Sequence, residues 1–236
     1  MDSQEGLYER HALSGPVRVQ GFLGFLFYRF QRFNLRRCDA VKKLLPEHIG
    51  HLLDVGCGKG DFLFSIQNKV QYGLGLDIAA YNIEQANQVK KQTNAHNLEF
   101  SCSAIEDFKN GIQFDCITSI ALLAFIFDPF FVFKKFNQWL KKDGFLIVQV
   151  PNMACITNRL SLLFGVFPRT SWNEGWDGGH INYFTFHSLI HRLFIPSGFE
   201  IVRLHNSGIF ARLRGLYRSL LAPDIIVMAR KVRDIE

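Results

Sequence analysis

Three closely spaced glycines mark the first part of the chain that could do chemistry. Gly56, Gly58 and Gly60 follow the apolar run at residues 51–55 in the string HLLDVGCGKGDF. Glycines between a buried strand and a helix let the backbone turn sharply and approach a ligand closely. The spacing is G-x-G-x-G, and Asp61 stands where the dinucleotide fingerprint G-x-G-x-x-G requires glycine. A carboxylate at this helix N-terminus would repel a pyrophosphate, so a ligand without phosphate is favoured.

Two carboxylates flank the glycine loop. Asp54 precedes it and suits a cationic ligand such as S-adenosylmethionine (SAM), which carries an amino group and a sulfonium but no phosphate. Asp77 closes the apolar run YGLGLD, where an acidic side chain can accept both hydroxyls of an adenosine ribose. A second interpretation is that Asp77 caps the helix starting at Ala79. The two features predict a nucleoside site, and Asp61 makes SAM a better ligand than a nicotinamide cofactor.

A further candidate for chemistry lies in the string GGHINYFT. His180 follows two glycines, and Tyr183 stands three residues further on. We interpret His180, with Tyr183, as the candidate general base or substrate contact, because imidazole exchanges a proton near neutral pH. The alternative is that His180 hydrogen-bonds the backbone and orders the loop before the next helix. Transfer from a sulfonium to an ionisable hydroxyl or amine can also depend largely on proximity and orientation.

Alternating apolar strands and amphipathic helices must position these residues. Strands are predicted at 51–55, 72–77, 98–102, 114–120, 144–150, 199–205 and 224–232, and helices at 61–69, 79–93, 129–141 and 185–195. This alternation predicts an α/β fold with a Rossmann-like, doubly wound, mostly parallel seven-stranded sheet whose last strand is antiparallel. Ligands of such sheets bind beyond the carboxyl ends of the strands, where the glycine loop and Asp77 are expected.

Two further segments complete the expected organisation. Residues 1–46 are predicted to form a loose tail and a helix from Val17 to Leu45, which packs as a cap over the ligand pocket. Residues 47–236 form the main domain. Within it, residues 151–184 break the alternation and are rich in aromatic residues, Asn and Gly. Insertions of this length are commonly lids or binding loops, so we expect this one to cover the substrate.

Five motifs occur in the order typical of one enzyme family: LLDVGCGKGDF, GLGLDIAAYNIEQA, LEFSCSAIEDF, FDCITSIALLAFIFDP and LKKDGFLIVQVPN. Over about residues 50–205 the chain resembles class I SAM-dependent methyltransferases, and it is most similar to the small-molecule branch that includes the ubiquinone-biosynthesis type enzymes. The resemblance implies that residues 47–236 are a methyltransferase domain with SAM as cofactor. The implied acceptor is an oxygen, or in second place a nitrogen or carbon, of a small or carrier- or lipid-linked molecule.

The resemblance also implies roles for individual residues. The methionine part of SAM would be surrounded by Asp54, Gly56, Cys57, Gly58 and Gly60. Asp77 would bind the ribose hydroxyls, and Ile78 would lie against the adenine ring. The adenine edge would be held by Ser103, Ala104 and Ile105, although relatives often have Asp where this chain has Ser103. The strand end beside the sulfonium would be formed by Ser119 and Ile120.

One departure from the family concerns the run from Leu123 to Ile126. Many relatives carry a Glu-His pair here, whereas this run contains no titratable group. The general base or metal ligand that some relatives use is therefore missing. The five cysteines form no CxxC pair, so no metal site is expected. A methyltransferase whose base lies elsewhere and a non-catalytic SAM-binding or scaffold protein both stay open.

The chain of 236 residues has a formal net charge of +6, which favours acidic or phosphorylated partners. Basic residues gather at 18–43 and at 212–218, where they could bind such a substrate, contact an anionic membrane, or simply form solvated helix faces. Nucleic acid is not expected as a partner, because no motif of base methylation and no RNA-binding module occurs. With no secretory signal, we expect a cytoplasmic protein, with peripheral contact at the inner membrane face as an open alternative.

Overall fold

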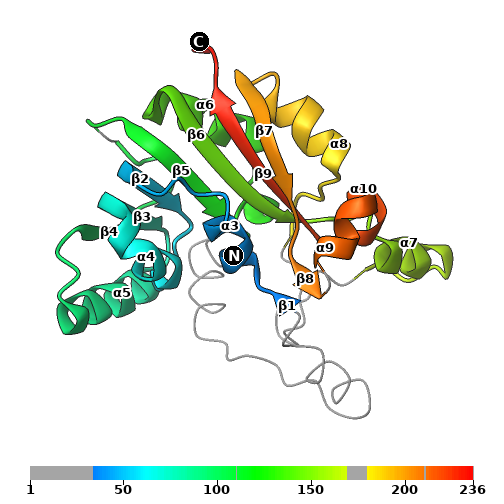
Figure 1. The fold of residues 1–236 in the computed structure, drawn as a ribbon, viewed down its shortest axis with the longest axis horizontal. Helices are drawn as coiled ribbons and strands as arrows, with labels where there is room; N and C mark the ends of the chain where they lie inside the picture. The colour runs from blue at the N-terminus through cyan, green and yellow to red at the C-terminus, as the bar shows by residue number, and fades with distance from the viewer. Residues whose placement is uncertain (1–33, 110, 169–179, 210, 236) are drawn as a thin grey trace, which may run out of the picture.

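A twisted sheet with helices on both faces forms the centre of the molecule (Figure 1). The computed structural model describes residues 34–109, 111–168, 180–209 and 211–235. The sheet contains β2 (Ile49–Val55), β3 (Val70–Asp77), β4 (Leu98–Cys102), β5 (Phe114–Ile120), β6 (Leu140–Pro151), β7 (Phe199–His205) and β9 (Asp224–Lys231). Their order is β4-β3-β2-β5-β6-β9-β7, and β9 is antiparallel to both its neighbours. The predicted doubly wound, mostly parallel seven-stranded sheet with an antiparallel last strand is confirmed.

The strands form where the sequence has apolar runs, because a parallel sheet is covered on both faces. In β2, all four residues from Leu52 to Val55 are buried. The predicted bounds of β4, β5 and β7 agree with the structure to the residue. β9 lies between β6 and β7, so β7 and not the last strand forms this edge of the sheet.

Two helical layers cover the sheet. One layer contains α3 (Arg37–Lys42), α4 (Asp61–Ile66), the 3-10 turn η2 (Gln67–Lys69) and α5 (Ala80–Thr93). The other contains α6 (Pro129–Trp139), α8 (Phe186–Leu189) and the π-helical turn η4 (Ile190–Phe194). Phenylalanines are frequent in this second layer, where the rings of Phe133 and Phe194 pack edge to face with 4.9 Å between their centroids.

The chain departs from the sequence prediction before the sheet begins. Of the helix predicted from Val17 to Leu45, residues 17–33 lie outside the described part of the chain. Asn34–Leu35 form a strand, β1, which pairs antiparallel with β8 (Gly208–Ile209), and only Arg37–Lys42 are helical. The prediction of a continuous helix is therefore wrong for this part. The β1–β8 pairing joins residues more than 170 positions apart, so no local periodicity in the sequence indicates it.

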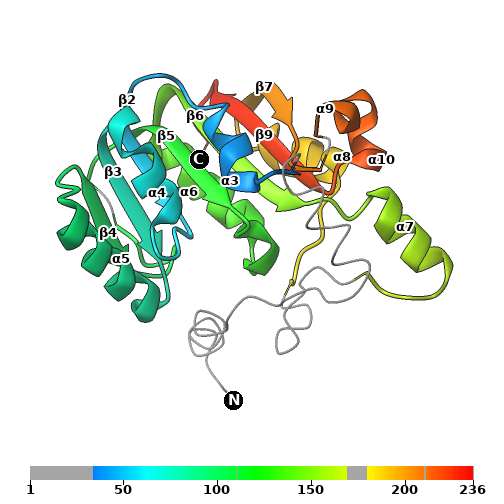
Figure 2. The same cartoon turned by 60° about the horizontal axis from the view of Figure 1, so that its bottom comes forward.

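The insertion at 151–184 contains more regular structure than the sequence suggests. It includes α7 (Ile156–Leu163), while residues 169–179 lie outside the described part. Residues 211–221 form three short turns of helix: α9 (Ala211–Arg214), η5 (Gly215–Tyr217) and α10 (Arg218–Leu221). Figure 2 shows α7 and α10 at the same end of the molecule, beyond β6 and β9. None of the helices that the structure describes is long and apolar enough to cross a membrane.

Candidate active site

The glycine loop turns the chain from β2 into α4 at the carboxyl edge of the sheet. Gly56, Gly58 and Gly60 all have positive φ, at 77°, 54° and 80°, which glycine adopts without strain. A Cβ at Gly60 would lie 2.6 Å from the Phe100 ring, whereas a Cβ at Gly58 would meet nothing within 4 Å. The third glycine therefore serves close packing of the loop, and the second faces open space in which a ligand could approach the backbone.

Asp77 ties the loop to the start of α5. One carboxylate oxygen, Oδ2, accepts the Gly58 N–H at 2.8 Å. The other, Oδ1, accepts the Ala79 N–H at 2.9 Å and the Asn82 side-chain amide at 3.3 Å. Asp77 does not cap α5 itself, because the N-cap residue is Ala79 and it has no side-chain cap; Asp77 instead orders the turn before the helix. The same residue also lines a cavity, so ordering this turn and binding a ligand do not exclude each other.

This cavity, which we call the Asp77 cavity, lies between the carboxyl ends of β2, β3, β4 and β5 and has a volume of about 100 Å³. Six of the residues predicted to bind the cofactor line it: Gly56, Asp77, Ile78, Ser103, Ala104 and Ile105. Five residues that the sequence did not single out complete the lining: Leu76, Glu106, Leu122, Ile126 and Phe127. Apolar walls with a carboxylate at one end suit part of a purine nucleoside, the rest of which would extend beyond a cavity of this volume.

Asp54 lies beneath this edge and is only 2% exposed. Its Oδ1 accepts a hydrogen bond from the Thr118 hydroxyl at 2.6 Å. Burial raises the pKa of Asp54 to about 7, the hydrogen bond from Thr118 opposes this rise, and the negative charge of Asp77 adds to it. A buried carboxylate without a cationic partner among the described residues fits a cationic ligand at this place.

The other predicted residues do not line the Asp77 cavity. The thiol of Cys57 is buried in the layer of α4, where burial raises its pKa well above the usual range, and its backbone N–H donates to the Leu76 carbonyl at 3.0 Å. Cys57 therefore contributes its backbone and not a reactive thiol. Ser119 is fully buried, and its hydroxyl has no hydrogen-bond partner in the described part of the chain. An orphaned hydroxyl at the end of β5 fits a site that a polar ligand completes. Ile120 is half-buried against the layer of α3, α4 and α5, the same layer that buries the Cys57 thiol.

His180 is held over the run that follows β5. The backbone N–H groups of Ile181 and Asn182 donate to the Ala124 carbonyl at 2.7 and 3.0 Å, and the Asn182 amide donates to the Ile126 carbonyl at 2.6 Å. The His180 ring packs edge to face on Phe125, with 4.6 Å between centroids. The segment with His180 is thus docked on the run from Leu123 to Ile126, and it places an imidazole beside a run that has no titratable group.

Burial lowers the pKa of His180, and the positive charge of Arg37 lowers it further. The imidazole is therefore neutral at pH 7 and can accept a proton. Tyr183 lies beside it, with 6.4 Å between the ring centroids, and is 40% exposed. The structure brings the two predicted residues together and shows which segment holds them.

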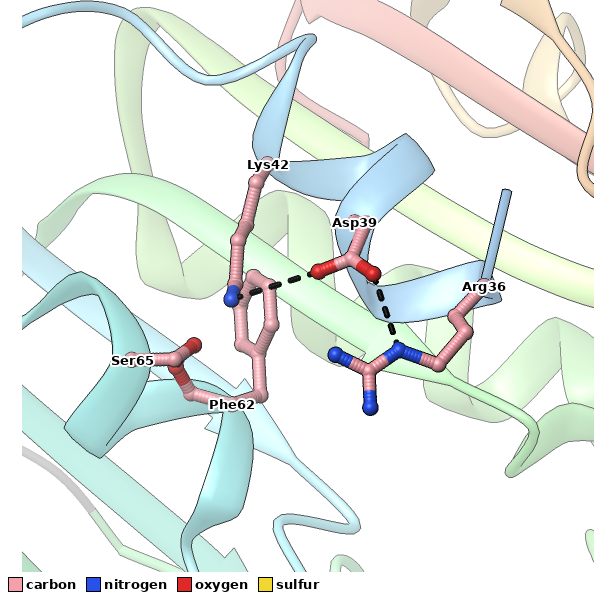
Figure 3. Close-up of polar contacts among 5 residues, drawn as sticks. All are labelled: Arg36, Asp39, Lys42, Phe62 and Ser65. Carbon is pink, nitrogen blue, oxygen red and sulfur yellow. Dashed lines mark hydrogen bonds and ion pairs between the residues drawn. The ribbon is translucent and has the colours of Figure 1, made fainter. Parts of the chain in front are cut away.

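A second, larger cavity of about 630 Å³ lies on the other side of the glycine loop, between α3, α4 and the β1–β8 ribbon. Figure 3 shows its polar wall, where Asp39 accepts hydrogen bonds from Arg36 at 2.9 Å and Lys42 at 3.5 Å, opposite Phe62 and Ser65. We call it the α3 cavity. Its lining is Leu35, Arg36, Arg37, Cys38, Asp39, Lys42, Asp61, Phe62, Ser65, Ser207, Gly208 and Asp224.

Arg37 is the residue of this cavity that sequence reasoning did not distinguish from the other basic residues around it. Its charge acts on both Cys38 and His180, so it lies near the catalytic candidate. Only the fold reveals this, because Arg37 and His180 are far apart in sequence. Within the described ranges, no group of three or more His, Cys, Asp or Glu side chains could hold a metal ion.

Comparisons with known proteins identify the family and the fold of this chain. Residues 48–171, just over half of the chain, match a family described as a methyltransferase domain. Two ubiquinone biosynthesis O-methyltransferases from Neisseria meningitidis, of serogroups A and C, are each 26% identical to the chain over 104 residues. These matches cover 43% of this chain and 44% of each relative, so the chain matches less than half the length of these curated relatives.

Solved structures share the fold. A SAM-dependent methyltransferase from Mesorhizobium loti superposes with a TM-score of 0.58 at 20% identity, over 81% of this chain and 95% of its own. The N-methyltransferase NodS from Bradyrhizobium japonicum, solved with S-adenosylhomocysteine, superposes with a TM-score of 0.60 at 15% identity, over 98% of this chain and 100% of its own. The [4+2]-cyclase SpnF superposes with a TM-score of 0.65 at 15% identity, over 98% of this chain and 97% of its own.

The sheet order is that of a class I SAM-dependent methyltransferase, a class whose cofactor is SAM. The chain belongs to the methyltransferase domain family that matches residues 48–171. The resemblance seen in its five motifs is confirmed.

Proposed function

We propose that this methyltransferase transfers the methyl group of SAM to an oxygen of a small or carrier-linked acceptor, with His180 as the general base. The observation that carries the proposal is the docking of the His180 segment on the run that follows β5. A hydroxyl must lose its proton as its oxygen is methylated, and a neutral, half-buried imidazole can accept that proton. The relatives from Neisseria, which are named O-methyltransferases, support oxygen as the accepting atom.

The residues around the glycine loop would hold SAM in an extended position. Asp77 would accept hydrogen bonds from the ribose hydroxyls, and Ile78 with Ser103 would enclose the adenine in the Asp77 cavity. Asp54 would balance the positive charges of the ligand. Arg37, on the far side of the loop, would pair with the carboxylate of the methionine part. When bound, SAM supplies an electrophilic methyl carbon and leaves as S-adenosylhomocysteine.

The proposal is tested by measuring S-adenosylhomocysteine released from SAM in the presence of phenols that carry alkyl tails. His180→Ala should lower this release by about 100-fold or more, since a positioned general base contributes on that order. Its SAM affinity should stay unchanged, because His180 does not line the Asp77 cavity. The matched control is His187→Ala, which removes an exposed histidine of α8. Equal turnover by His180→Ala and His187→Ala would contradict the role given to His180.

A further inference from the structure

The insertion presents an apolar surface that no described part of the chain covers. None of the side chains of α7 is buried. Leu163 is 76% exposed and Phe164 79% exposed, and they belong to a run of exposed apolar residues, which marks an interaction site more than single exposed residues do. The exposed apolar residues of α7 and the turn after it are Ile156, Leu160, Leu162, Leu163, Phe164, Val166 and Phe167.

A second apolar segment lies at the same end of the molecule (Figures 1 and 2). On the turns from α9 to α10, Leu213, Leu216, Tyr217 and Leu221 are exposed, Leu216 by 84%. Asn152 joins the two segments: its amide donates to the Ser219 and Ala222 carbonyls at 3.1 and 2.8 Å, and its Oδ1 accepts the Ala154 N–H at 3.0 Å. We call the exposed residues of both segments the apolar face.

The charge of these segments indicates what the apolar face contacts. Residues 156–168 and 208–222 contain four arginines and neither Asp nor Glu. Exposed leucines and aromatic rings combined with arginines, and without acidic residues, are the composition that binds the surface of an anionic bilayer.

Aromatic contacts connect this face with the proposed acceptor site. The ring of Phe167, which belongs to the apolar face, packs edge to face on Tyr183 at 5.4 Å between centroids. Tyr183 in turn contacts His180, and His180 contacts Phe125. A molecule leaving a bilayer beside α7 would therefore meet His180 along an aromatic path.

We propose that the apolar face binds the surface of an anionic phospholipid bilayer, and that the methyl acceptor is an amphipathic molecule which reaches His180 from that bilayer. The statement about the acceptor rests on the proposed function. The statement about the bilayer rests on the apolar face alone.

The test is co-sedimentation of the purified protein with vesicles of phosphatidylcholine, pure or mixed with phosphatidylglycerol. The wild type should sediment with the mixed vesicles, less with the pure ones, and less at high salt. The double variant Leu163→Ser/Phe164→Ser should bind the mixed vesicles about tenfold more weakly or worse, because two large side chains no longer enter the interface. Phe130→Ser, which changes an exposed phenylalanine of α6, is the matched control and should bind like the wild type.

Three results would overturn the bilayer contact: no sedimentation with either vesicle, equal binding by the double variant, or a wild-type dimer that the double variant converts to a monomer without any vesicle binding. Calorimetry with SAM on the same samples keeps the two proposals apart. SAM binding without vesicle binding contradicts the bilayer contact alone, whereas vesicle binding without SAM binding contradicts the proposed function alone.

Discussion

Asp54 is the residue for which the structure allows a quantitative prediction. Its pKa is raised by burial from 3.8 to about 7, which is a difference of about three pKa units and therefore about 4 kcal/mol of free energy. Because the folded state holds the proton more tightly than the unfolded state, the free energy of unfolding is unaffected below pH 3.8. It falls as the pH rises from there to about 7, and stays lower by about 4 kcal/mol above.

The perturbation is Asp54→Asn, which keeps an oxygen to accept the hydrogen bond from Thr118 but cannot ionise. The assay is urea unfolding of both proteins without SAM at about pH 5.5 and about pH 8. Between these values the variant should gain about 2 kcal/mol of stability relative to the wild type, since that share of the penalty develops in this window. All other titrating groups are common to both proteins and cancel in the difference.

A stability difference between wild type and variant that does not depend on pH would refute this reasoning. So would a wild type that gains stability over the variant as the pH rises, because that sign belongs to a carboxylate with a lowered pKa. Thr118→Val is a further control. Loss of its hydrogen bond to the carboxylate should raise the pKa of Asp54 and move the pH window upward.

Three other predictions concern the cofactor site. The affinity of the wild type for SAM, measured by calorimetry, should rise as the pH passes through about 7, because an ionised Asp54 attracts the cationic ligand. The affinity of Asp54→Asn should not depend on pH in this range. A wild-type affinity that does not change with pH would contradict this. Gly60→Ala should destabilise the fold by about 2 kcal/mol or more in thermal unfolding, because its Cβ would meet Phe100. Gly58→Ala should destabilise the fold by only about 1 kcal/mol, which comes from its positive φ. Equal losses of stability in the two variants would contradict the packing role of Gly60. Phe127→Ala should leave stability nearly unchanged, since Phe127 is 83% exposed, but weaken SAM binding by about 1 kcal/mol; unchanged SAM binding would show that Phe127 does not contact the ligand.

The central part of the fold could be predicted because its signals are local. A few neighbouring residues are enough to predict each of β4, β5, β7 and the glycine loop. The β1–β8 pairing could not be predicted, since two short strands far apart in sequence form it through the backbone alone.

The site shows the same division. Asp77 ends one predicted strand and Ser103 directly follows another, so their convergence on one cavity follows from the parallel sheet. The docking of the His180 segment depends on the backbone carbonyls of Ala124 and Ile126. Because every residue carries a backbone carbonyl, no residue type in the sequence predicts this docking. The departure at residues 123–126, which in sequence indicates a missing base, is in the structure the surface on which the His180 segment docks.

The most direct test of the central claim, a SAM-dependent methyltransferase with its cofactor in the Asp77 cavity, is a calorimetric titration of the folded protein with SAM. One molecule of SAM should bind per chain, and Asp77→Ala should weaken the binding by about 2 to 3 kcal/mol, because hydrogen bonds from the ribose to a charged acceptor are lost. No heat of binding from a folded wild type, or equal affinity in Asp77→Ala, would contradict the account.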